Sequence, residues 1–313
     1  MAYARHWIVG PGAIGRLLAL RLAQNGHSVT LMGRRPLPTH QTLITPQGEA
    51  LSLEVVTRTT PPPEAPDVLH LTTKAYAAEA AYGAVVAGLP AGTPLVLWQN
   101  GFHTQPHLDA HHGGPVLCAT TTEGAYVTAD DRVVHAGHGD TAIGSLGGDH
   151  DALSQAMARQ LNAAGLSARA VPDIRRRLWH KLAVNAAINP LVAHHRIRNG
   201  ELRDAPFRGE VEAVIGEVAA VMQAEGIAPP AGAGLDGWRA LVWKVVEATA
   251  DNRASMLQDV LAGRPTEHAA ILGPLCVAAR HRGLMTPRLD ALLEALASDA
   301  PTPEMTPGVR PQR

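Results

Sequence analysis

Two patterns of apolar and polar residues alternate along the first half of the chain. Short runs rich in β-branched and aliphatic residues are separated by stretches with helical periodicity, such as Ala13 to Asn25. The apolar runs are HWIVG (6–10), SVTLMG (28–33), VLHLTTK (68–74), TPLVLWQN (93–100) and PVLCATTT (115–122). Strands that alternate with helices are typical of βαβ units around a parallel sheet. The pattern therefore predicts an N-terminal α/β domain.

The pattern changes after about Pro172, where the apolar residues recur with the period of long helices. These helices are expected at 175–194, 207–225, 235–250, 267–281 and 288–297. We therefore predict an α/β domain over 1–172 followed by an all-α C-terminal domain over 173–299. The proline-rich segment 300–313 is expected to be a disordered tail.

Two irregular segments interrupt the α/β part. Residues 59–67 (TTPPPEAPD) contain too many prolines for a helix or a central strand, so we expect a surface loop. Residues 132–145 (RVVHAGHGDTAIGS) contain two apolar stretches bounded by glycines, which predicts a hairpin or a pair of edge strands.

A glycine-rich turn follows the first expected strand. Gly10, Gly12 and Gly15 in IVGPGAIG have the GxGxxG spacing and lie directly before the helix that begins at Ala13. The first two glycines allow the backbone to approach a pyrophosphate, the third allows the helix to pack on the strand, and the helix N-terminus offers unpaired N–H groups. In this context the motif predicts a dinucleotide site in a Rossmann-type domain.

The end of the second strand distinguishes the two nicotinamide dinucleotides. An NAD-preferring site usually places an acid there, about 20 residues after the glycines, to bind the ribose 2′-hydroxyl. This chain has LMGRRP, with Arg34 and Arg35 and no acid. A guanidinium forms forked hydrogen bonds with a phosphate, so we expect NADPH, with Arg34 on the 2′-phosphate.

A polar stripe crosses an otherwise apolar helix in KLAVNAAINPLVA. Lys181, Asn185 and Asn189 recur every fourth residue and therefore share one helix face. Asparagines satisfied by backbone in a core would explain the stripe, but buried amides and an ammonium are costly without partners, and a cleft wall that binds a small polar molecule explains it better. An ammonium can also stabilise and protonate the oxygen of a ketone that accepts a hydride, which makes Lys181 a candidate proton donor.

Two further segments concentrate polar groups. Asn252 and Ser255 are three residues apart and would share a face if helical, where they could bind a small carboxylate or hydroxyl. Thr266 and Glu267 precede an apolar helix and could serve simply as its N-terminal cap and first-turn acid.

Composition excludes several classes of function. Hydrophobic residues make up 46% of the 313-residue chain, charged residues 18%, and the net charge is -1, so no basic footprint for nucleic acid is present. Cys118 and Cys276 stand far apart in apolar contexts, no secretory leader is recognisable, and no run is long enough to span a membrane. We expect a cytoplasmic protein that acts on a small molecule.

The 16 histidines raise the question of a metal site. The densest groups are 111–112, 135–138 and 194–195. Adjacent histidines point in different directions, and none of these groups is joined by a well-spaced acid or cysteine. We interpret them as solvated loop histidines and expect no metal. No GxSxG motif supports serine hydrolysis.

Taken in order, these motifs resemble the ketopantoate reductase (2-dehydropantoate 2-reductase) family over nearly the whole chain. The matching stretches are GPGAIG (10–15), TKA (73–75), QNG (99–101), LWHKLAVNAAINPL (178–191), NGELR (199–203), DNRASMLQD (251–259) and RPTE (264–267). The resemblance implies NADPH-dependent reduction of 2-dehydropantoate to (R)-pantoate, in the route to pantothenate and coenzyme A. It also implies a possible homodimer formed through the helical domain.

The resemblance assigns a role to each candidate residue. Lys181 matches the catalytic lysine and Glu267 the active-site glutamate, which binds a substrate hydroxyl or holds the lysine. The implied cofactor residues are Gly10, Gly12, Ala13, Ile14 and Gly15 of the glycine loop, Arg34 on the 2′-phosphate, and Lys74 and Asn100 beside the nicotinamide and its ribose. Those that bind or surround the substrate are Asn185, Asn189, Asn199, Asn252 and Ser255.

Two departures from the family pattern keep other functions open. Many relatives have Asn-Gly-x-Gly where this chain has Phe102 and His103 after Asn100-Gly101, and relatives commonly continue Asp-Tyr-Ile-Asn-Gly after the glutamate, whereas this chain has HAAILG at 268–273. The alternatives are a reductase of a different branched 2-oxo acid and an NADPH-binding sensor without catalysis. A sensor would need the glycines and Arg34 but not Lys181 together with Glu267 and the asparagines.

Overall fold

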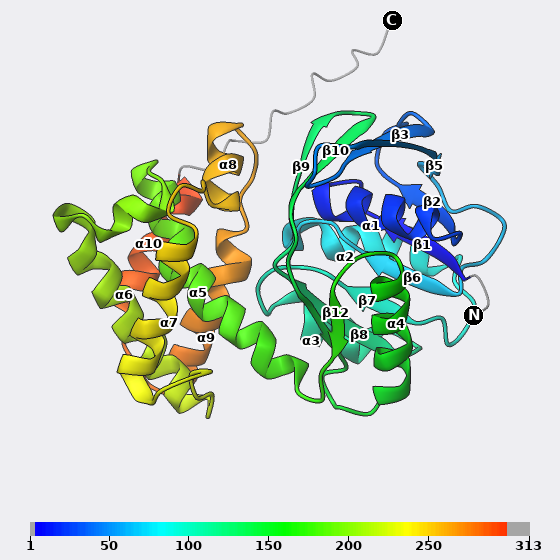
Figure 1. Cartoon of the computed structure of the whole chain (residues 1–313). Helices are drawn as coiled ribbons and strands as arrows, with labels where there is room; N and C mark the ends of the chain where they lie inside the picture. Colours follow the sequence, from blue (N-terminus) through cyan, green and yellow to red (C-terminus); the bar gives the residue numbers. More distant parts are fainter. Residues whose placement is uncertain (1–3, 299–313) are drawn as a thin grey trace, which may run out of the picture. The chain divides into compact units, whose positions relative to one another are not determined.

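The computed structural model describes residues 4–298, which divide between Leu182 and Ala183 into two compact units, called unit 1 and unit 2. The division lies within helix α5 (Ile174–His195), about ten residues after the domain boundary expected from the sequence. The expected tail at 300–313 lies outside the described residues. Each unit is described separately below (Figure 1).

The described part of unit 1 contains an eight-stranded sheet with the order β12-β11-β8-β7-β6-β1-β2-β5. Its strands are β1 (Arg5–Val9), β2 (Ser28–Met32), β5 (Val56–Arg58), β6 (Val68–Leu71), β7 (Leu95–Leu97), β8 (Val116–Thr121), β11 (Thr141–Gly144) and β12 (Ala168–Ala170). The six strands from β5 to β8 pair in parallel, and β11 runs antiparallel to β8. Continuous apolar runs such as those of β1 and β6 are typical of parallel strands buried on both faces. The α/β fold with a parallel sheet is therefore confirmed.

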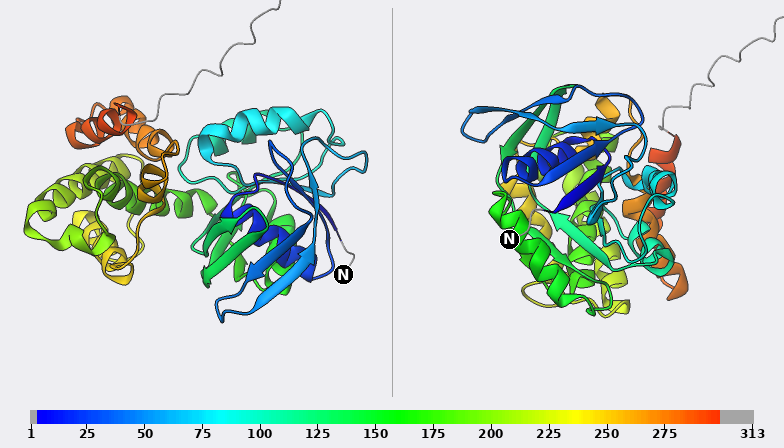
Figure 2. Two further views of the ribbon diagram at one scale, coloured as in Figure 1. Left: turned by 90° about the horizontal axis from the view of Figure 1, so that it is seen from above. Right: turned by 90° about the vertical axis from the view of Figure 1, so that its right-hand side faces the viewer.

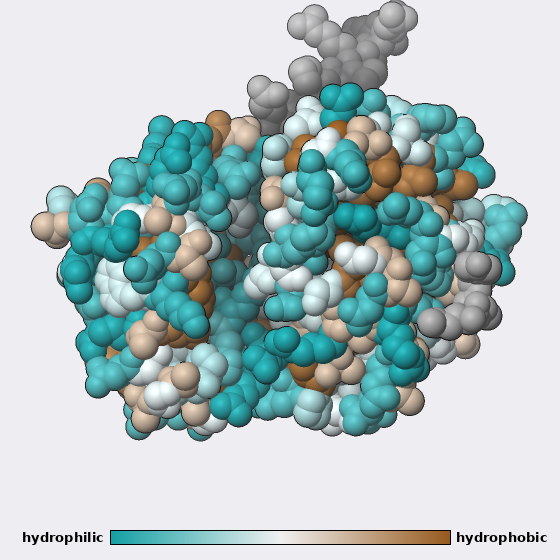
Figure 3. Space-filling view, in the orientation of Figure 1, coloured by the Kyte–Doolittle hydropathy of each residue, from teal (hydrophilic) through white to brown (hydrophobic). Residues whose placement is uncertain are grey.

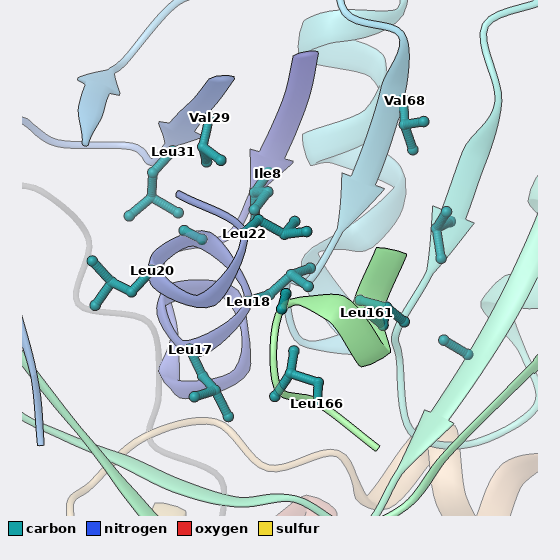
Figure 4. Packing of buried hydrophobic residues seen from close by; sticks show 14 of the residues in the cluster. Ile8, Leu17, Leu18, Leu20, Leu22, Val29, Leu31, Val68, Leu161 and Leu166 are labelled. Atoms are coloured by element: carbon teal, nitrogen blue, oxygen red, sulfur yellow. The ribbon is translucent and has the colours of Figure 1, made fainter. Parts of the chain in front are cut away.

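Helices cover both faces of this sheet, as Figure 2 shows. They are α1 (Ala13–Gln24), α2 (Ala75–Val86), α3 (Thr104–His111) and α4 (Asp151–Ala163). One apolar cluster joins α1 and α4 to one face, through side chains such as Leu17, Leu18 and Leu161 (Figure 4). A second cluster joins α2 and α3 to the other face through Ala78, Val85 and Leu108. The sheet is therefore the middle layer of this unit.

A second sheet, which the sequence did not predict, has the order β4-β3-β10-β9. It consists of β3 (His40–Ile44), β4 (Ala50–Glu54), β9 (Gly124–Ala129) and β10 (Arg132–Gly137) and contacts α1. The expected hairpin at 132–145 is wrong, because β10 pairs with β9 and β3, whereas β11 pairs with β8 and β12. The glycines at 137 and 139 carry the chain from one sheet to the other rather than closing a turn between partners. The loop expected at 59–67 contains no helix or strand, as predicted.

Unit 2 is helical throughout its described residues, as predicted. After α5 come η1 (Asn199–Arg203), α6 (Ala205–Ala224), α7 (Gly234–Ala248), α8 (Ser255–Leu261), α9 (His268–His281) and α10 (Pro287–Ser298). Helix α6 contacts α7, α9 and α10 and buries Val211, Val214, Ile215 and Val218 at helical spacing. No helix of the described residues is both long and apolar enough to cross a membrane. On the face seen in Figure 3, hydrophilic residues predominate and apolar residues are scattered in small groups.

Two histidine rings lie buried within the large sheet, next to the half-buried indole of Trp98. His6 and His70 are fully buried, and their rings are joined by a bond of 2.9 Å between His6 Nδ1 and His70 Nε2. Trp98 donates from Nε1 to His70 Nδ1 at 3.2 Å. Because an indole only donates, His70 carries its proton on Nε2 and donates to His6. Burial lowers the pKa of His6 to about 4 and lowers that of His70 as well.

This pair makes the stability of the fold depend on pH. A histidine with a depressed folded-state pKa takes up its proton more readily in the unfolded chain, so its contribution is complete above about pH 6.5 and falls as the pH drops towards 4. The shift of His6 corresponds to a loss of about 3 kcal/mol of unfolding free energy over that range. Unfolding in urea at pH 7, 5.5 and 4.5 measures this loss of unfolding free energy.

His27 and His268 also have pKa values lowered by burial, so the matched comparison is between variants. His6→Asn keeps an acceptor for His70 but does not titrate, and it should flatten the pH dependence. His40→Asn removes a histidine whose side chain is 71% exposed and should leave the dependence unchanged. Equal pH slopes in all three proteins would contradict the assignment to the buried pair.

Candidate active site

The residues expected to bind the dinucleotide lie at one edge of the large sheet. The strand order reverses between β1 and β6, and ligands of such sheets bind outside the carboxyl ends of the strands at that point. The glycine loop follows β1, Lys74 follows β6, Asn100 follows β7, and Thr121 ends β8. Because these four strands are parallel, their ends share one edge of unit 1.

Backbone packing explains two of the three glycines in the loop. Gly10 has φ +112°, and a Cβ there would lie 2.5 Å from the Thr73 nitrogen. A Cβ on Gly15 would lie 2.1 Å from the Gly10 carbonyl oxygen. Gly12 has no atom within 4 Å of its Cβ position, so its missing side chain leaves open space at the start of α1. That space is where the motif requires a ligand to approach the backbone.

The N-terminus of α1 is suited to an anion. Gly12 is the N-cap residue, without a side-chain cap, and the first turn contains no acid. The first N–H groups of an uncapped helix have no partner within the helix, and together with the helix dipole they attract negative charge. Ala13 and Ile14 begin this helix, and Ile14 also borders a small pocket with Thr121 and Glu123.

Arg16 holds the glycine loop, and sequence reasoning missed it. Its side chain is 3% exposed, and its Nε donates to the Pro11 carbonyl at 2.8 Å. Its NH1 group donates to the carbonyls of Ala129, at 3.1 Å, and Asp130, at the tip of the β9–β10 hairpin. In the sequence it looks like an ordinary helix arginine, and only the burial of this turn reveals its role.

The two arginines after β2 differ in their surroundings. Arg35 forms an exposed forked ion pair with Asp130, with bonds of 2.5 and 2.6 Å. The side chain of the exposed Arg34 makes no hydrogen bond or ion pair with residues 4–298. Arg34 is therefore the one of these two guanidiniums that stays available to another group, and its role on a 2′-phosphate stays a prediction.

Buried amides join the ends of β6 and β7. Gln99 is 3% exposed and donates to the carbonyls of Leu71 at 2.8 Å and Thr73 at 3.2 Å. Gln105, fully buried, donates in turn to the Gln99 carbonyl at 2.8 Å. These bonds fix the backbone directly before Lys74 and directly before Asn100, which are both half-buried.

The departure at Phe102 is accounted for by packing within unit 1. Its ring lies against the indole of Trp179 on α5, with centroids 5.3 Å apart. Gly101, the preceding residue, has φ +86°, which favours glycine. His103 is the N-cap residue of α3. The bulky side chain therefore contacts the helix that carries Lys181.

Lys181 is held by the end of β8. Its ammonium donates to the Thr121 carbonyl at 2.8 Å, and the residue is half-buried. Four and eight residues on, Asn185 is half-buried and Asn189 is 9% exposed, while Leu182, Ala183, Ala186 and Ala187 are at most 1% exposed. The stripe is thus not a solvated helix face, in agreement with the sequence interpretation.

Unit 2 brings two of the predicted substrate residues together. The Asn199 backbone N–H donates to the Asn252 carbonyl at 3.1 Å, and its side-chain Nδ2 donates to Thr249 Oγ1 at 2.9 Å. Asn199 is 6% exposed, and its Oδ1 atom has no hydrogen-bond partner within the described residues. A buried acceptor without a partner is suited to a donor from a ligand.

Two local expectations in unit 2 are wrong. Asn252 and Ser255 do not share a helix face, because Asn252 lies in the turn before α8 and Ser255 is the first residue of that helix. Thr266 and Glu267 do not cap α9 by side-chain hydrogen bonds. Instead the Thr266 hydroxyl bonds His268 Nδ1 at 2.7 Å, and Glu267 is 5% exposed. Helix capping therefore does not account for the buried glutamate.

The interpretation of His135 as a solvated loop residue is also wrong. It lies on β10, is fully buried, and bonds Glu123 Oε2 through Nε2 at 2.6 Å. With His138 these residues place potential ligand atoms within 4.8 Å of one another. His135 Nδ1 faces Arg21 NH2 at 3.1 Å, and a guanidinium only donates, so the ring proton lies on Nε2 and points at Glu123. A metal at Nε2 would have to displace that proton, so the arrangement favours a hydrogen-bond network.

Comparison with known proteins extends over both units. The family model for ketopantoate reductase PanE/ApbA matches residues 7–148, and the model for its C-terminal part matches 173–299. A 2-dehydropantoate 2-reductase of Vibrio cholerae is 37% identical over 92% of this chain and 95% of its own length. One of Archaeoglobus fulgidus is 35% identical over 88% of this chain and 90% of its own.

Solved structures agree on the fold. A PanE/ApbA family ketopantoate reductase from Ralstonia eutropha superposes with a TM-score of 0.85 at 24% identity, covering 95% of this chain and 98% of the other. A D-mandelate dehydrogenase with NADH and anilino(oxo)acetate gives 0.84 at 21% identity over the same shares. With two family models and full-length relatives above 30% identity, this chain belongs to the ketopantoate reductase family.

Proposed function

We propose that this protein reduces 2-dehydropantoate to (R)-pantoate with NADPH, using Lys181 as the general acid. The observation that carries the proposal is the position of the Lys181 ammonium, bound to the end of β8 at the edge of the sheet where the glycine loop, Lys74 and Asn100 also lie. The names of the relatives supply the substrate.

The residues fit the cofactor. Gly12 leaves its backbone open, and the uncapped start of α1 offers N–H groups to a pyrophosphate. Arg34 has a guanidinium that no residue of the described part of the chain binds, and it is assigned to the 2′-phosphate. When bound, the dihydronicotinamide supplies the hydride that C2 of the substrate accepts. Lys74 and Asn100 belong to this part of the site in the proposal.

In the proposal, residues of the protein donate the proton and bind the substrate. Reduction of the ketone builds negative charge on its oxygen, and the Lys181 ammonium stabilises that charge and donates the proton. Asn199 offers its buried Oδ1 to a substrate hydroxyl, and Asn185, Asn189, Asn252 and Ser255 surround the substrate. Glu267 is assigned to a substrate hydroxyl or to Lys181.

The lysine content adds support for this role. Only Lys74, Lys181 and Lys244 are lysines among the 27 lysines and arginines of the sequence. A guanidinium keeps its proton at any ordinary pH, whereas an ammonium can release and regain one. Two of the three lysines thus stand at the proposed reaction site, where that difference matters, and Lys244 is exposed on α7.

A different 2-oxo acid is the second candidate. His103 stands where many relatives have glycine, the neighbouring Phe102 packs on Trp179, and a structural neighbour with 21% identity is a D-mandelate dehydrogenase. Absorbance of NADPH should fall on addition of 2-dehydropantoate faster than with phenylglyoxylate or other branched 2-oxo acids. Faster turnover of one of those would transfer the proposal to it, and binding without any turnover would favour a sensor.

The proposal includes the cytoplasmic location expected from the sequence. Cys118 and Cys276 are both free and buried, as a reducing compartment permits. The homodimer implied by the family resemblance stays a prediction.

Replacement of Arg34 should separate the two cofactors. Loss of a charge-assisted bond of about 1.5–3 kcal/mol in Arg34→Ala should raise the Kd for NADPH by roughly 10- to 100-fold and leave that for NADH within about twofold. Arg35→Ala is the matched control, because an exposed pair such as Arg35–Asp130 contributes little. Fluorescence titration measures both. Weaker NADPH binding in Arg35→Ala alone would reverse the assignment.

Replacement of Lys181 should stop the chemistry while preserving cofactor binding. Lys181→Ala should lower kcat by roughly two to four powers of ten with an almost unchanged Kd for NADPH, as expected for a lost general acid. Lys181→Arg keeps the positive charge but cannot release a proton readily, and it should be almost as slow. Lys244→Ala is the control. Steady-state assays decide, and normal turnover in Lys181→Ala would end the proposal.

A further inference from the structure

A partly buried chain of polar residues connects α1 to the carbonyl that holds Lys181. Thr121, whose carbonyl accepts from the Lys181 ammonium at 2.8 Å, is the last residue of β8. Its hydroxyl oxygen accepts from the Glu123 backbone N–H at 3.1 Å and lies 3.0 Å from Thr141 Oγ1 on β11. The turn from Thr121 to Glu123 is therefore bound on both sides.

The Glu123 carboxylate fixes the other end of this turn. Its side chain is 3% exposed, and Oε2 accepts from His135 Nε2 at 2.6 Å and from the Gly139 N–H at 3.0 Å. Gly139 lies so close that a Cβ would fall 2.3 Å from the Thr122 carbonyl carbon. The approach of the Gly139 backbone thus depends on the absence of a side chain.

The direction of each hydrogen bond between Arg21, His135 and Glu123 is determined. Arg21 NH2 donates to His135 Nδ1 at 3.1 Å, so the His135 proton lies on Nε2 and is donated to Glu123. Arg21 projects from α1, the helix that follows the glycine loop. If the direction of any one of these hydrogen bonds were reversed, a neighbouring group would lose its hydrogen-bond partner.

Stability alone does not account for this arrangement. Arg21 Nε and Glu123 Oε1 are buried without hydrogen-bond partners within the described residues. Leu17, Leu18 and Leu166 border the same small pocket as Glu123, so the carboxylate is surrounded largely by apolar groups. Apolar side chains of similar size often replace a buried ionic network without loss of stability, which suggests that this one is kept for position.

We propose that Arg21, His135 and Glu123 are positioning residues that fix the Thr121 carbonyl and through it the Lys181 ammonium. They act on the general acid from unit 1 and touch neither the proton in transfer nor the substrate. This inference rests on the proposed function for its catalytic consequence. The position of the ammonium itself can be measured without turnover.

Two readouts test the proposal in the full-length protein. In Glu123→Ala, kcat should fall by roughly 100-fold, as for a misplaced catalytic group, while KM for 2-dehydropantoate and Kd for NADPH stay within about twofold. In protein labelled with 15N at lysine Nζ, the Lys181 ammonium signal should be sharp in the wild type and lost through rapid hydrogen exchange in the variant. With three lysines in the chain, Lys181→Arg assigns the signal.

Matched variants distinguish an effect on the position of Lys181 from effects of the Glu123 charge and of folding. Glu123→Gln retains an oxygen that can accept both bonds and should restore kcat and the Lys181 signal to near wild-type values. His138→Ala removes an exposed neighbour of His135 that lies outside the chain of bonds and should change neither. If Glu123→Ala fails to fold, Thr121→Val removes the hydroxyl with little change of shape and should reproduce the loss.

The remaining outcomes would overturn the positioning proposal or separate it from the proposed function. An unchanged Lys181 signal in Glu123→Ala or Thr121→Val would overturn the proposal whatever the activity. Equal losses in Glu123→Gln and Glu123→Ala would also overturn it, because charge rather than position would then matter. If the wild type does not reduce 2-dehydropantoate, the proposed function fails, and the lysine signal still decides the positioning role.

Discussion

The close approach of two backbone segments at the carboxyl edge of the sheet is the constraint on which the rest of the site depends. Gly10 packs directly on Thr73, and the Thr72 hydroxyl donates to the Gly10 carbonyl at 2.7 Å. This contact fixes where α1 begins and where Lys74 follows β6. Parallel pairing then brings the ends of β7 and β8 to the same edge. The groups that we assign to cofactor and proton transfer in unit 1 are therefore arranged by main-chain geometry before any side chain acts.

Repetitive patterns carried most of the fold. The βαβ alternation and the helical periods placed five strands, α1 and five helices of the C-terminal domain within a few residues, because the local sequence shows which positions are buried. Helices α2, α3, α4 and α8 were not predicted by range. The small sheet was missed, since β3, β4 and β9 are partly exposed and lack the apolar runs that identify buried strands. Strands 132–137 and 141–144 were wrongly paired with each other, because partner choice depends on residues distant in the chain.

The residues of the candidate site were also indicated only in part by the sequence. Motif spacing singled out the glycines, Arg34 and Lys181, and residue type and context suggest the roles that we propose for them. Arg16, Glu123 and His135 gave no such signal, because their importance lies in burial and in partners up to 114 residues away. Isolated carboxylates and histidines in a sequence more often belong to solvated loops, and that expectation failed for His135. The error shows that a charged residue's environment cannot be read from its neighbours in sequence.

Burial of Arg16 has an electrostatic consequence beyond holding the loop. Its four bonded acceptors, the carbonyls of Pro11, Ala129 and Asp130 and the side-chain oxygen of Gln41, are neutral groups, so none of these bonds pairs the guanidinium with a negative charge. A full positive charge therefore stays in the first turn of α1, next to the partial charge of the helix end. Counter-ions screen a buried charge less than an exposed one. An anion at the glycine loop would thus be attracted by a field whose source it does not touch, and that attraction would persist at salt concentrations that suppress surface arginines.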